Sequence, residues 1–165
     1  MPRIDSEILI RRSPEDVFDL AQDYGLRLEW DPFLSAMRFL DGAAEAAVGV
    51  RVWVRAKNGM AMTVRYIALN RPKSVAMQME DGDSLLFAKF SGTWKFEAAQ
   101  SDDSTRVTFV YSFEPRFAQF LLNPIISRVF QRDIRKRLAG LKHHAENTNI
   151  IQRMHAANRE PSACG

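Results

Sequence analysis

Two tyrosines in the middle of the chain are the side chains best suited to bind a ligand or to move a proton. Tyr66 and Tyr111 both occupy apolar positions of alternating segments, so we expect both to point inward. A buried phenol hydroxyl normally needs a hydrogen-bond partner. Each hydroxyl could therefore bond a ligand carbonyl or hydroxyl, or it could bond only the backbone or water. Ligand binding, proton transfer and plain packing all stay open for these two residues.

The histidines are poorly placed for catalysis or metal binding. His143, His144 and His155 lie at or beyond the end of the last predicted helix, where we expect solvent. Neighbouring residues on a helix point about 100° apart, so His143 and His144 do not form a ready metal pair. Without a histidine or cysteine on the inner face, a nucleophilic triad or a zinc site is not expected. We predict no catalytic residue, no metal and no cofactor.

The composition is that of a single globular domain. The chain has 165 residues, 46% of them hydrophobic and 26% charged, with a net charge of +3. Its one cysteine, Cys164, suits a reducing compartment. The N-terminus lacks the apolar core of a signal peptide, so we expect a cytoplasmic protein. We assign residues 1–146 to the domain and residues 147–165 to a polar, flexible tail.

Segments of alternating apolar and polar residues predict a β-sheet. We expect a first strand from Ile4 to Ile10 and six more at Leu34–Leu40, Val50–Ala56, Met60–Leu69, Val75–Glu80, Leu86–Ala98 and Thr105–Glu114. The connections are short and rich in Gly, Asn and Asp, which favours antiparallel pairing of consecutive strands. At least five of the strands have one apolar face, so the sheet buries that face and exposes the other.

Helices are predicted near the start and at the end of the chain. Ser13 and Pro14 indicate the start of an early helix, and a second short piece covers Leu26–Trp30. We expect a long helix from Pro124 to Ala145, capped by Asn123. Its apolar stripe consists of Ile126, Val129, Phe130, Ile134, Leu138, Leu141 and Ala145. The basic residues beside the stripe are expected to form a solvated face: Arg128, Arg132, Arg135, Lys136, Arg137 and Lys142.

The stripe and the apolar sheet face must cover each other. We therefore predict an α+β fold in which a curved antiparallel sheet wraps around the long helix and the early helices close one end. The residues predicted to line a cavity there are Met62, Val64, Tyr66, Met77, Met79, Phe90, Trp94, Phe109, Tyr111, Phe130 and Ile134. The methionines suit an adaptable lining, although they could equally fill a core. Asp31 or Tyr24 could lie at the cavity mouth.

Several short segments also carry a resemblance to a known superfamily. They are Ser13–Phe18, Trp30-Asp31-Pro32, Gly92-Thr93-Trp94, Thr105–Thr108 and Leu138–Lys142. In this order, over residues 3–146, the chain resembles the START-like or Bet v 1-like (SRPBCC) superfamily, in particular its polyketide cyclase/dehydrase and lipid-transport branch. The resemblance implies a helix-grip fold with a deep cavity for lipids, sterols, quinones or polyketides. It also implies that a minority of members are enzymes.

Three functions are therefore compatible with the sequence. The first is binding or transport of a hydrophobic small molecule, and the second is a polyketide aromatase/cyclase- or dehydratase-like activity. The third is an interaction module that docks on a protein partner through the outer face or the segment 117–122. A weak membrane-surface contact could involve Phe117, Phe120, Arg128 and Arg132. Nucleic-acid binding is not expected, because aromatic residues are not interleaved along the basic face.

Overall fold

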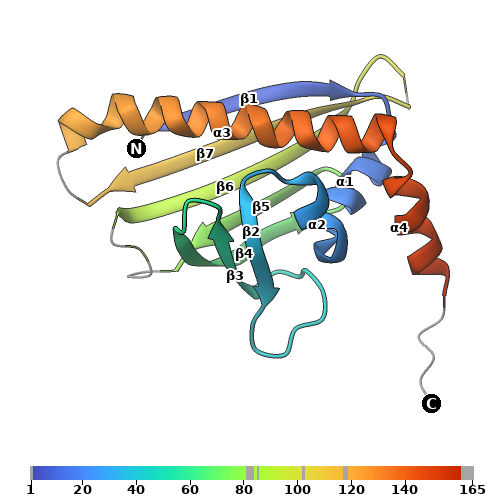
Figure 1. The fold of residues 1–165 in the computed structure, drawn as a ribbon, viewed down its shortest axis with the longest axis horizontal. Coiled ribbons are helices and arrows are strands. Elements are labelled where there is room, and N and C mark those ends of the chain that lie inside the picture. The colour runs from blue at the N-terminus through green and yellow to red at the C-terminus, as the bar shows by residue number, and fades with distance from the viewer. Residues whose placement is uncertain (1, 81–83, 85, 102, 117–118, 161–165) are drawn as a thin grey trace.

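A seven-stranded antiparallel sheet and one long helix make up most of the molecule (Figure 1). The computed structural model describes residues 2–80, 84, 86–101, 103–116 and 119–160. The strands are β1 (Arg3–Ile10), β2 (Leu34–Phe39), β3 (Arg51–Ala56), β4 (Ala61–Asn70), β5 (Ser74–Met79), β6 (Phe87–Ala98) and β7 (Thr105–Pro115). Every predicted strand is confirmed, and each end differs from its prediction by at most one residue.

The strand order follows the chain except for the first strand. Strands β2 to β7 pair with their sequence neighbours, and β1 pairs with β7, which gives the order β1-β7-β6-β5-β4-β3-β2. Shifts in register interrupt β2 near Leu34, β4 near Tyr66 and β6 near Phe87. Such bulges bend strands and increase their twist. The predicted α+β helix-grip architecture is confirmed, with the sheet curving around one face of the long helix (Figure 1).

The long helix α3 (Gln119–Asn147) runs along β1 and β7 (Figure 1). It begins five residues before the predicted start at Pro124, so the prediction of a cap at Asn123 is wrong. Pro124 lies in the second turn, where a missing N–H removes only one backbone hydrogen bond close to the helix end. Phe130, Ile134, Leu138, Leu141 and Ala145 are buried as predicted, whereas Val129 is 49% exposed.

The basic residues of α3 divide into two groups. Arg128, Arg132 and Arg135 are exposed, as predicted for a solvated face. Arg137 was assigned to the same face and that prediction is wrong, because its side chain is buried. Phe117 and the side chain of Phe120 lie outside the described residues. No described helix is both long enough and apolar enough to cross a bilayer.

The C-terminal segment is helical rather than irregular. Helix α4 (Ile150–Arg159) follows α3 after a short break and contacts α1 and α3 (Figure 1). Its apolar side chains Ile150, Ile151 and Met154 are all buried in the core. The prediction of a polar tail after residue 146 is therefore wrong over this stretch, because three apolar residues on one face were hidden among polar neighbours. Residues 161–165 lie outside the described residues.

Two short helices between β1 and β2 close one end of the sheet. Helix α1 (Pro14–Gln22) begins at the predicted cap, where Ser13 Oγ accepts a hydrogen bond of 3.3 Å from the Asp16 N–H. Helix α2 (Tyr24–Trp30) begins two residues earlier than predicted, with Asp23 as its cap. The end of α2 is the part that positions the site described below.

Helices α2 and α3 approach each other very closely at Gly140. A Cβ atom on Gly140 would lie inside the van der Waals distance of the Trp30 carbonyl oxygen and 3.1 Å from Pro32 Cδ. Glycine alone permits this approach, since every other residue carries a Cβ. The contact brings Asp31, which follows Trp30, to the buried face of α3 one turn from Arg137.

Candidate ligand-binding site

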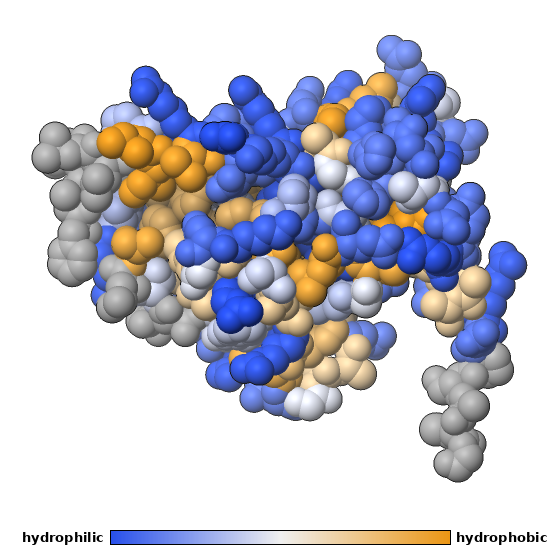
Figure 2. Space-filling model, in the orientation of Figure 1, coloured by the Kyte–Doolittle hydropathy of each residue, from blue (hydrophilic) through white to orange (hydrophobic). Residues whose placement is uncertain are grey.

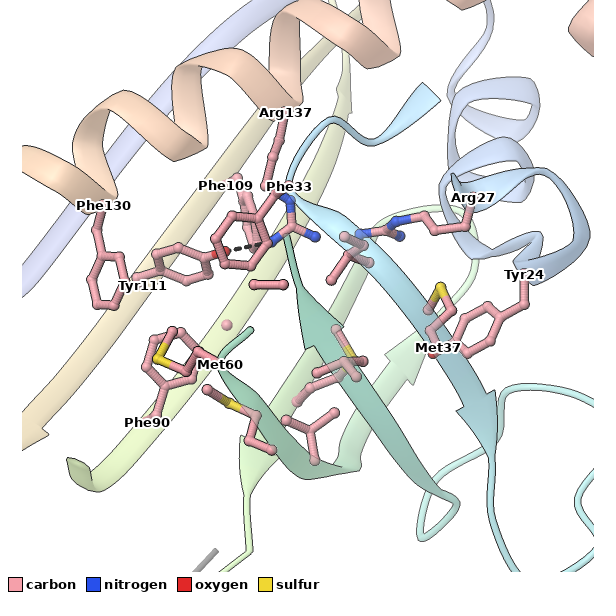
Figure 3. A pocket seen from close by; sticks show the side chains of 17 residues that line it. Tyr24, Arg27, Phe33, Met37, Met60, Phe90, Phe109, Tyr111, Phe130 and Arg137 are labelled. Carbon is pink, nitrogen blue, oxygen red and sulfur yellow. Dashed lines mark hydrogen bonds between the residues drawn. The ribbon is translucent and has the colours of Figure 1, made fainter. Parts of the chain in front are cut away.

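A pocket lies between the inner face of the sheet, α3 and the end of α2 (Figure 3). Its volume is about 70 Å³. Most of its wall is apolar, and two arginines and two tyrosines supply the polar atoms. The lining residues are Tyr24, Arg27, Phe33, Leu34, Met37, Val54, Ala56, Met60, Met62, Val64, Met77, Phe90, Gly92, Phe109, Tyr111, Phe130 and Arg137.

Most of the residues predicted to line a cavity do lie on this wall. They are Met62, Val64, Met77, Phe90, Phe109, Tyr111 and Phe130. Four methionines, Met37, Met60, Met62 and Met77, line the pocket, and the sequence pointed to only the last two. Gly92 faces the space from β6 with no side chain to fill it. The lining is therefore rich in flexible thioether side chains and aromatic rings.

The other four predicted residues lie in the core around the pocket and do not line it. Met79 and Ile134 are buried without reaching the wall. Trp94 stacks on Phe109 with 3.8 Å between ring centroids, so it packs behind the lining residue Phe109. Tyr66 lies beside the irregularity in β4, and its hydroxyl lies 2.6 Å from the Tyr24 hydroxyl and donates to Gln22 Oε1.

A buried cluster of charged residues forms the polar end of the pocket. The carboxylate of Asp31 lies between two guanidiniums: its Oδ2 accepts from Arg27 Nε at 2.9 Å and from Arg137 Nη2 at 2.7 Å. Arg137 Nε also donates to Oδ2, at 3.1 Å. The other carboxylate oxygen, Oδ1, accepts from the backbone N–H of Phe33 at 3.1 Å. The three side chains are at most 7% exposed.

Both guanidiniums line the pocket, and the carboxylate does not. Figure 3 shows Arg137 descending from α3 and Arg27 extending from α2 toward the same space. Arg137 Nη1 donates to the Tyr111 hydroxyl, and Arg27 Nη1 donates to the Ala21 carbonyl. Asp31 is fully buried behind them, so the prediction that it could lie at the mouth is wrong. Tyr24 does line the pocket, and it also borders a groove on the outer surface.

This cluster was missed in the sequence, although two signals were present. Arg137 lies three residues after Ile134 and one before Leu138, which places it on the buried stripe of α3. Arg27 and Asp31 are four residues apart, a spacing that allows an ion pair on a helix. Charged residues are almost never fully buried unless they are paired, so composition alone favoured a solvated arginine. Residue spacing could not reveal that Arg137 on α3 pairs with Asp31 at the end of α2.

The cluster carries a net positive charge. Burial raises the pKa of Asp31, but the guanidiniums of Arg137 and Arg27 outweigh burial and hold that pKa below its usual range. Burial raises the pKa of Tyr111, which stays a neutral phenol, and it raises the pKa of Tyr24 and Tyr66 in the same way. Two cations and one anion therefore face one another at neutral pH. Among the described residues no group of three or more His, Cys, Asp and Glu could hold a metal ion.

A second, open groove lies on the surface next to the pocket. It has a volume of about 410 Å³ and is bordered by Leu86, Ile125 and Val129, each of which is at least 49% exposed. Figure 2 shows the resulting apolar surface over the first half of α3. Met60 and Phe130 belong to the walls of both the groove and the pocket. These two side chains thus lie between the pocket and the groove.

Comparison with known proteins places this fold in a family. A family model described as polyketide cyclase/dehydrase and lipid transport matches residues 1–146. A START superfamily protein from Mycobacterium smegmatis is 11% identical, with a TM-score of 0.73 over 87% of this chain and 97% of that one. Ara h 8.0201 is 14% identical, with a TM-score of 0.66 over 87% of this chain and 97% of that one. Among curated proteins, none matches this sequence.

A further similar structure is that of the di-domain ARO/CYC BexL from the BE-7585A biosynthetic pathway. It is 20% identical, with a TM-score of 0.70 over 88% of this chain and 47% of that one. These identities are low, so the solved structures show the shared fold and the family model shows the membership. The resemblance inferred from the sequence is thereby confirmed. The chain belongs to the polyketide cyclase/dehydrase and lipid transport family.

Proposed function

We propose that this protein binds a hydrophobic small molecule in the pocket between the sheet and α3. The observation that supports this most directly is the pocket wall, which consists largely of methionines, aromatic rings and other apolar side chains. Burial of apolar ligand surface there contributes about 25 cal/mol per Å². The family, named for polyketide cyclases and lipid transport, agrees with a ligand of this kind.

The pocket must widen to admit a ligand larger than a few atoms. Its volume of about 70 Å³ corresponds to a few water molecules, since one water occupies roughly 10–15 Å³ on this measure. The outer groove of about 410 Å³ is separated from it by Met60 and Phe130. A change of rotamer in Met60 would join the two spaces, and methionine side chains are flexible enough to allow it. We therefore propose that ligands enter beside Met60 from the groove.

Filling the pocket is expected to block binding without unfolding the protein. At Gly92 an added Cβ would lie 3.5 Å from Phe109 and 3.6 Å from Tyr111, ordinary contact distances. Gly92→Leu places the rest of the side chain in the pocket, so we expect the affinity for a neutral apolar probe to fall at least about tenfold. N-phenyl-1-naphthylamine, whose fluorescence rises in apolar surroundings, measures this directly.

The matched control for this variant is Ser91→Leu on the same strand. Successive side chains on a strand point to opposite faces, so this change adds the same group outside the pocket. Ser91 pairs with Gln78 and Ser112 in the neighbouring strands. We expect Ser91→Leu to bind the probe as the wild type does. Equal binding by Gly92→Leu and the wild type would move the ligand site away from this pocket.

A second candidate function is a polyketide cyclase-like activity. The observation that favours it is the hydrogen bond between Arg137 and the Tyr111 hydroxyl, which places two donors at the end of an apolar pocket. Such donors stabilise the negative oxygen of an enolate during condensation of a poly-β-keto chain. Tyr111→Phe is then expected to lower turnover of a poly-β-keto thioester about 10- to 100-fold while N-phenyl-1-naphthylamine still binds. If the wild type shows no turnover, the cyclase-like activity is excluded and only the binding function remains.

A further inference from the structure

We propose that the ligand of this pocket is an amphipathic organic acid whose carboxylate binds Arg27 and Arg137 at the polar end. This inference rests on the proposed binding function and adds the chemical class of the ligand. It follows from the charge of the buried cluster, from the side of the cluster that faces the pocket and from the unused donors of the two guanidiniums.

The first step is the charge balance. Arg27, Asp31 and Arg137 are the charged residues that are buried among those the structure describes. Their charges sum to +1, since two guanidiniums face one carboxylate. Tyr24 and Tyr111, the other polar lining groups, are neutral. Uncompensated charge in a buried site is costly, so a second anion would stabilise this arrangement.

Within the described part of the chain, no carboxylate lines the pocket to supply that anion. Asp133, four residues before Arg137 on α3, lies in a shallow surface groove together with Lys57 and Lys136. From outside the pocket its charge interacts with Lys136, Arg137 and Arg132, so three cations share this carboxylate. Aromatic rings do lie against the guanidiniums: Arg137 Cζ is 5.0 Å from the Phe109 ring centroid, and Arg27 Cζ is 4.5 Å from that of Trp30. They fix the planes of the cations but carry no net charge.

The second step is the direction from which an anion can approach. Asp31 does not belong to the pocket wall, whereas both arginines do. A second anion would therefore have to come from the pocket itself. The rest of the wall is mostly apolar and includes Met62, Met77 and Phe90. A molecule that fits both parts has one compact anionic group on an apolar body.

The third step is the supply of hydrogen-bond donors. A guanidinium has five N–H donors. Among the described residues, Arg137 uses Nε and Nη2 on Asp31 and Nη1 on Tyr111. Arg27 uses Nε on Asp31 and Nη1 on Ala21, and its Nη2 makes no hydrogen bond within that part of the chain. Donors are thus left on both cations for a planar carboxylate, the group that arginine binds best.

The test compares one apolar body with and without the charge. Naphthalene-2-carboxylate and its methyl ester are titrated at pH 7 by calorimetry into the full chain. We expect the acid to bind about 10- to 100-fold more tightly than the ester, as charge-assisted hydrogen bonds would give. Arg137→Met is expected to abolish that preference, so that the acid and the ester bind with similar affinities. This variant leaves Arg27 and Asp31 as a neutral pair, so it removes an unbalanced charge.

Two further variants make the test decisive. Arg135→Met changes the same residue type on the exposed side of α3 and is expected to keep the preference for the acid. If Arg137→Met fails to fold, Arg27→Met takes its place, since it also leaves one arginine with Asp31. The carboxylate inference would be overturned if the wild type bound the acid and the ester with equal affinity. It would also be overturned if a folded Arg137→Met or Arg27→Met protein still preferred the acid. Failure of N-phenyl-1-naphthylamine to bind the wild type would instead overturn the proposed binding function.

Discussion

Replacing Asp31 by asparagine is expected to lower the free energy of unfolding by about 3–5 kcal/mol, the usual cost of leaving buried charge uncompensated. The Asp31 side chain has no exposed surface and accepts hydrogen bonds from both Arg27 and Arg137. An amide in place of the carboxylate would keep the shape but leave two buried cations without an anion. Urea unfolding followed by circular dichroism measures the loss.

Arg137→Met is the control for the asparagine variant. It removes a charge from the same cluster but leaves Arg27 and Asp31 balanced. We therefore expect it to destabilise the protein clearly less than Asp31→Asn does. An Asp31→Asn protein that unfolds at the wild-type urea concentration would contradict the charge assignment of the cluster.

The difference in unfolding free energy between the wild type and Asp31→Asn is expected to change with pH in a definite direction. Because the pKa of Asp31 is lowered in the folded protein, the folded state favours the carboxylate form. The stability contributed by Asp31 is then complete above its unfolded pKa of about 3.9 and is lost as the pH falls through the lower folded value. The difference between the wild type and Asp31→Asn is thus expected to be constant above about pH 5 and to shrink below about pH 4. Unfolding midpoints of both proteins across this range test it.

Replacing Gly140 by alanine is expected to destabilise the protein by about 1–3 kcal/mol, the usual cost of overpacking. This loss of stability is the opposite of what helix propensity predicts, since alanine in a free helix is favoured over glycine by about 1 kcal/mol. Here the methyl group would collide with the Trp30 carbonyl, which cannot move without shifting the end of α2. The displacement would pull Asp31 away from Arg137. Thermal and urea unfolding measure the change in stability.

The neighbouring position supplies the comparison for Gly140. Ala139 is exposed on the same helix, so Ala139→Gly tests helix propensity alone and should cost about 1 kcal/mol. Naphthalene-2-carboxylate binding by Gly140→Ala gives a second readout, since a shifted α2 disturbs the cluster. If Gly140→Ala were as stable as the wild type, α2 and α3 could move apart at no cost, and the prediction would be wrong.

The sheet was predictable because its signal is local. Each strand alternates apolar and polar residues, and each turn carries its own Gly, Asn or Asp, so neighbouring positions were enough. The inner face was also predictable, and Met62, Phe90 and Tyr111 point as expected. Which of the inward residues meet empty space was not predictable. Phe90 lines the pocket while Trp94 on the same strand packs against Phe109, because the position of α3 and α2 over the sheet decides where space is left.

The charged cluster could not be predicted because its parts come from distant elements. Arg137 and Asp31 are 106 residues apart, and helical spacing could reveal only the pairing of Asp31 with Arg27. The basic neighbours of Arg137 on α3 made a solvated face the simplest interpretation. Helix α4 was missed for a related reason, since Ile150, Ile151 and Met154 form a short stripe that only the packing against α1 and α3 makes stable.

The pairing of β1 with β7 also governs the order in which the protein can assemble. Strands β2 to β7 can form hairpins one after another as the chain lengthens, since each strand from β3 to β7 pairs with its predecessor. The first strand has to wait, because Arg3 pairs with Ser112 and Ile10 with Thr105. A ribosome must therefore release the chain as far as the end of β7 before β1 gains its neighbour. Such long loop closure makes the last step of sheet formation the entropically costly one.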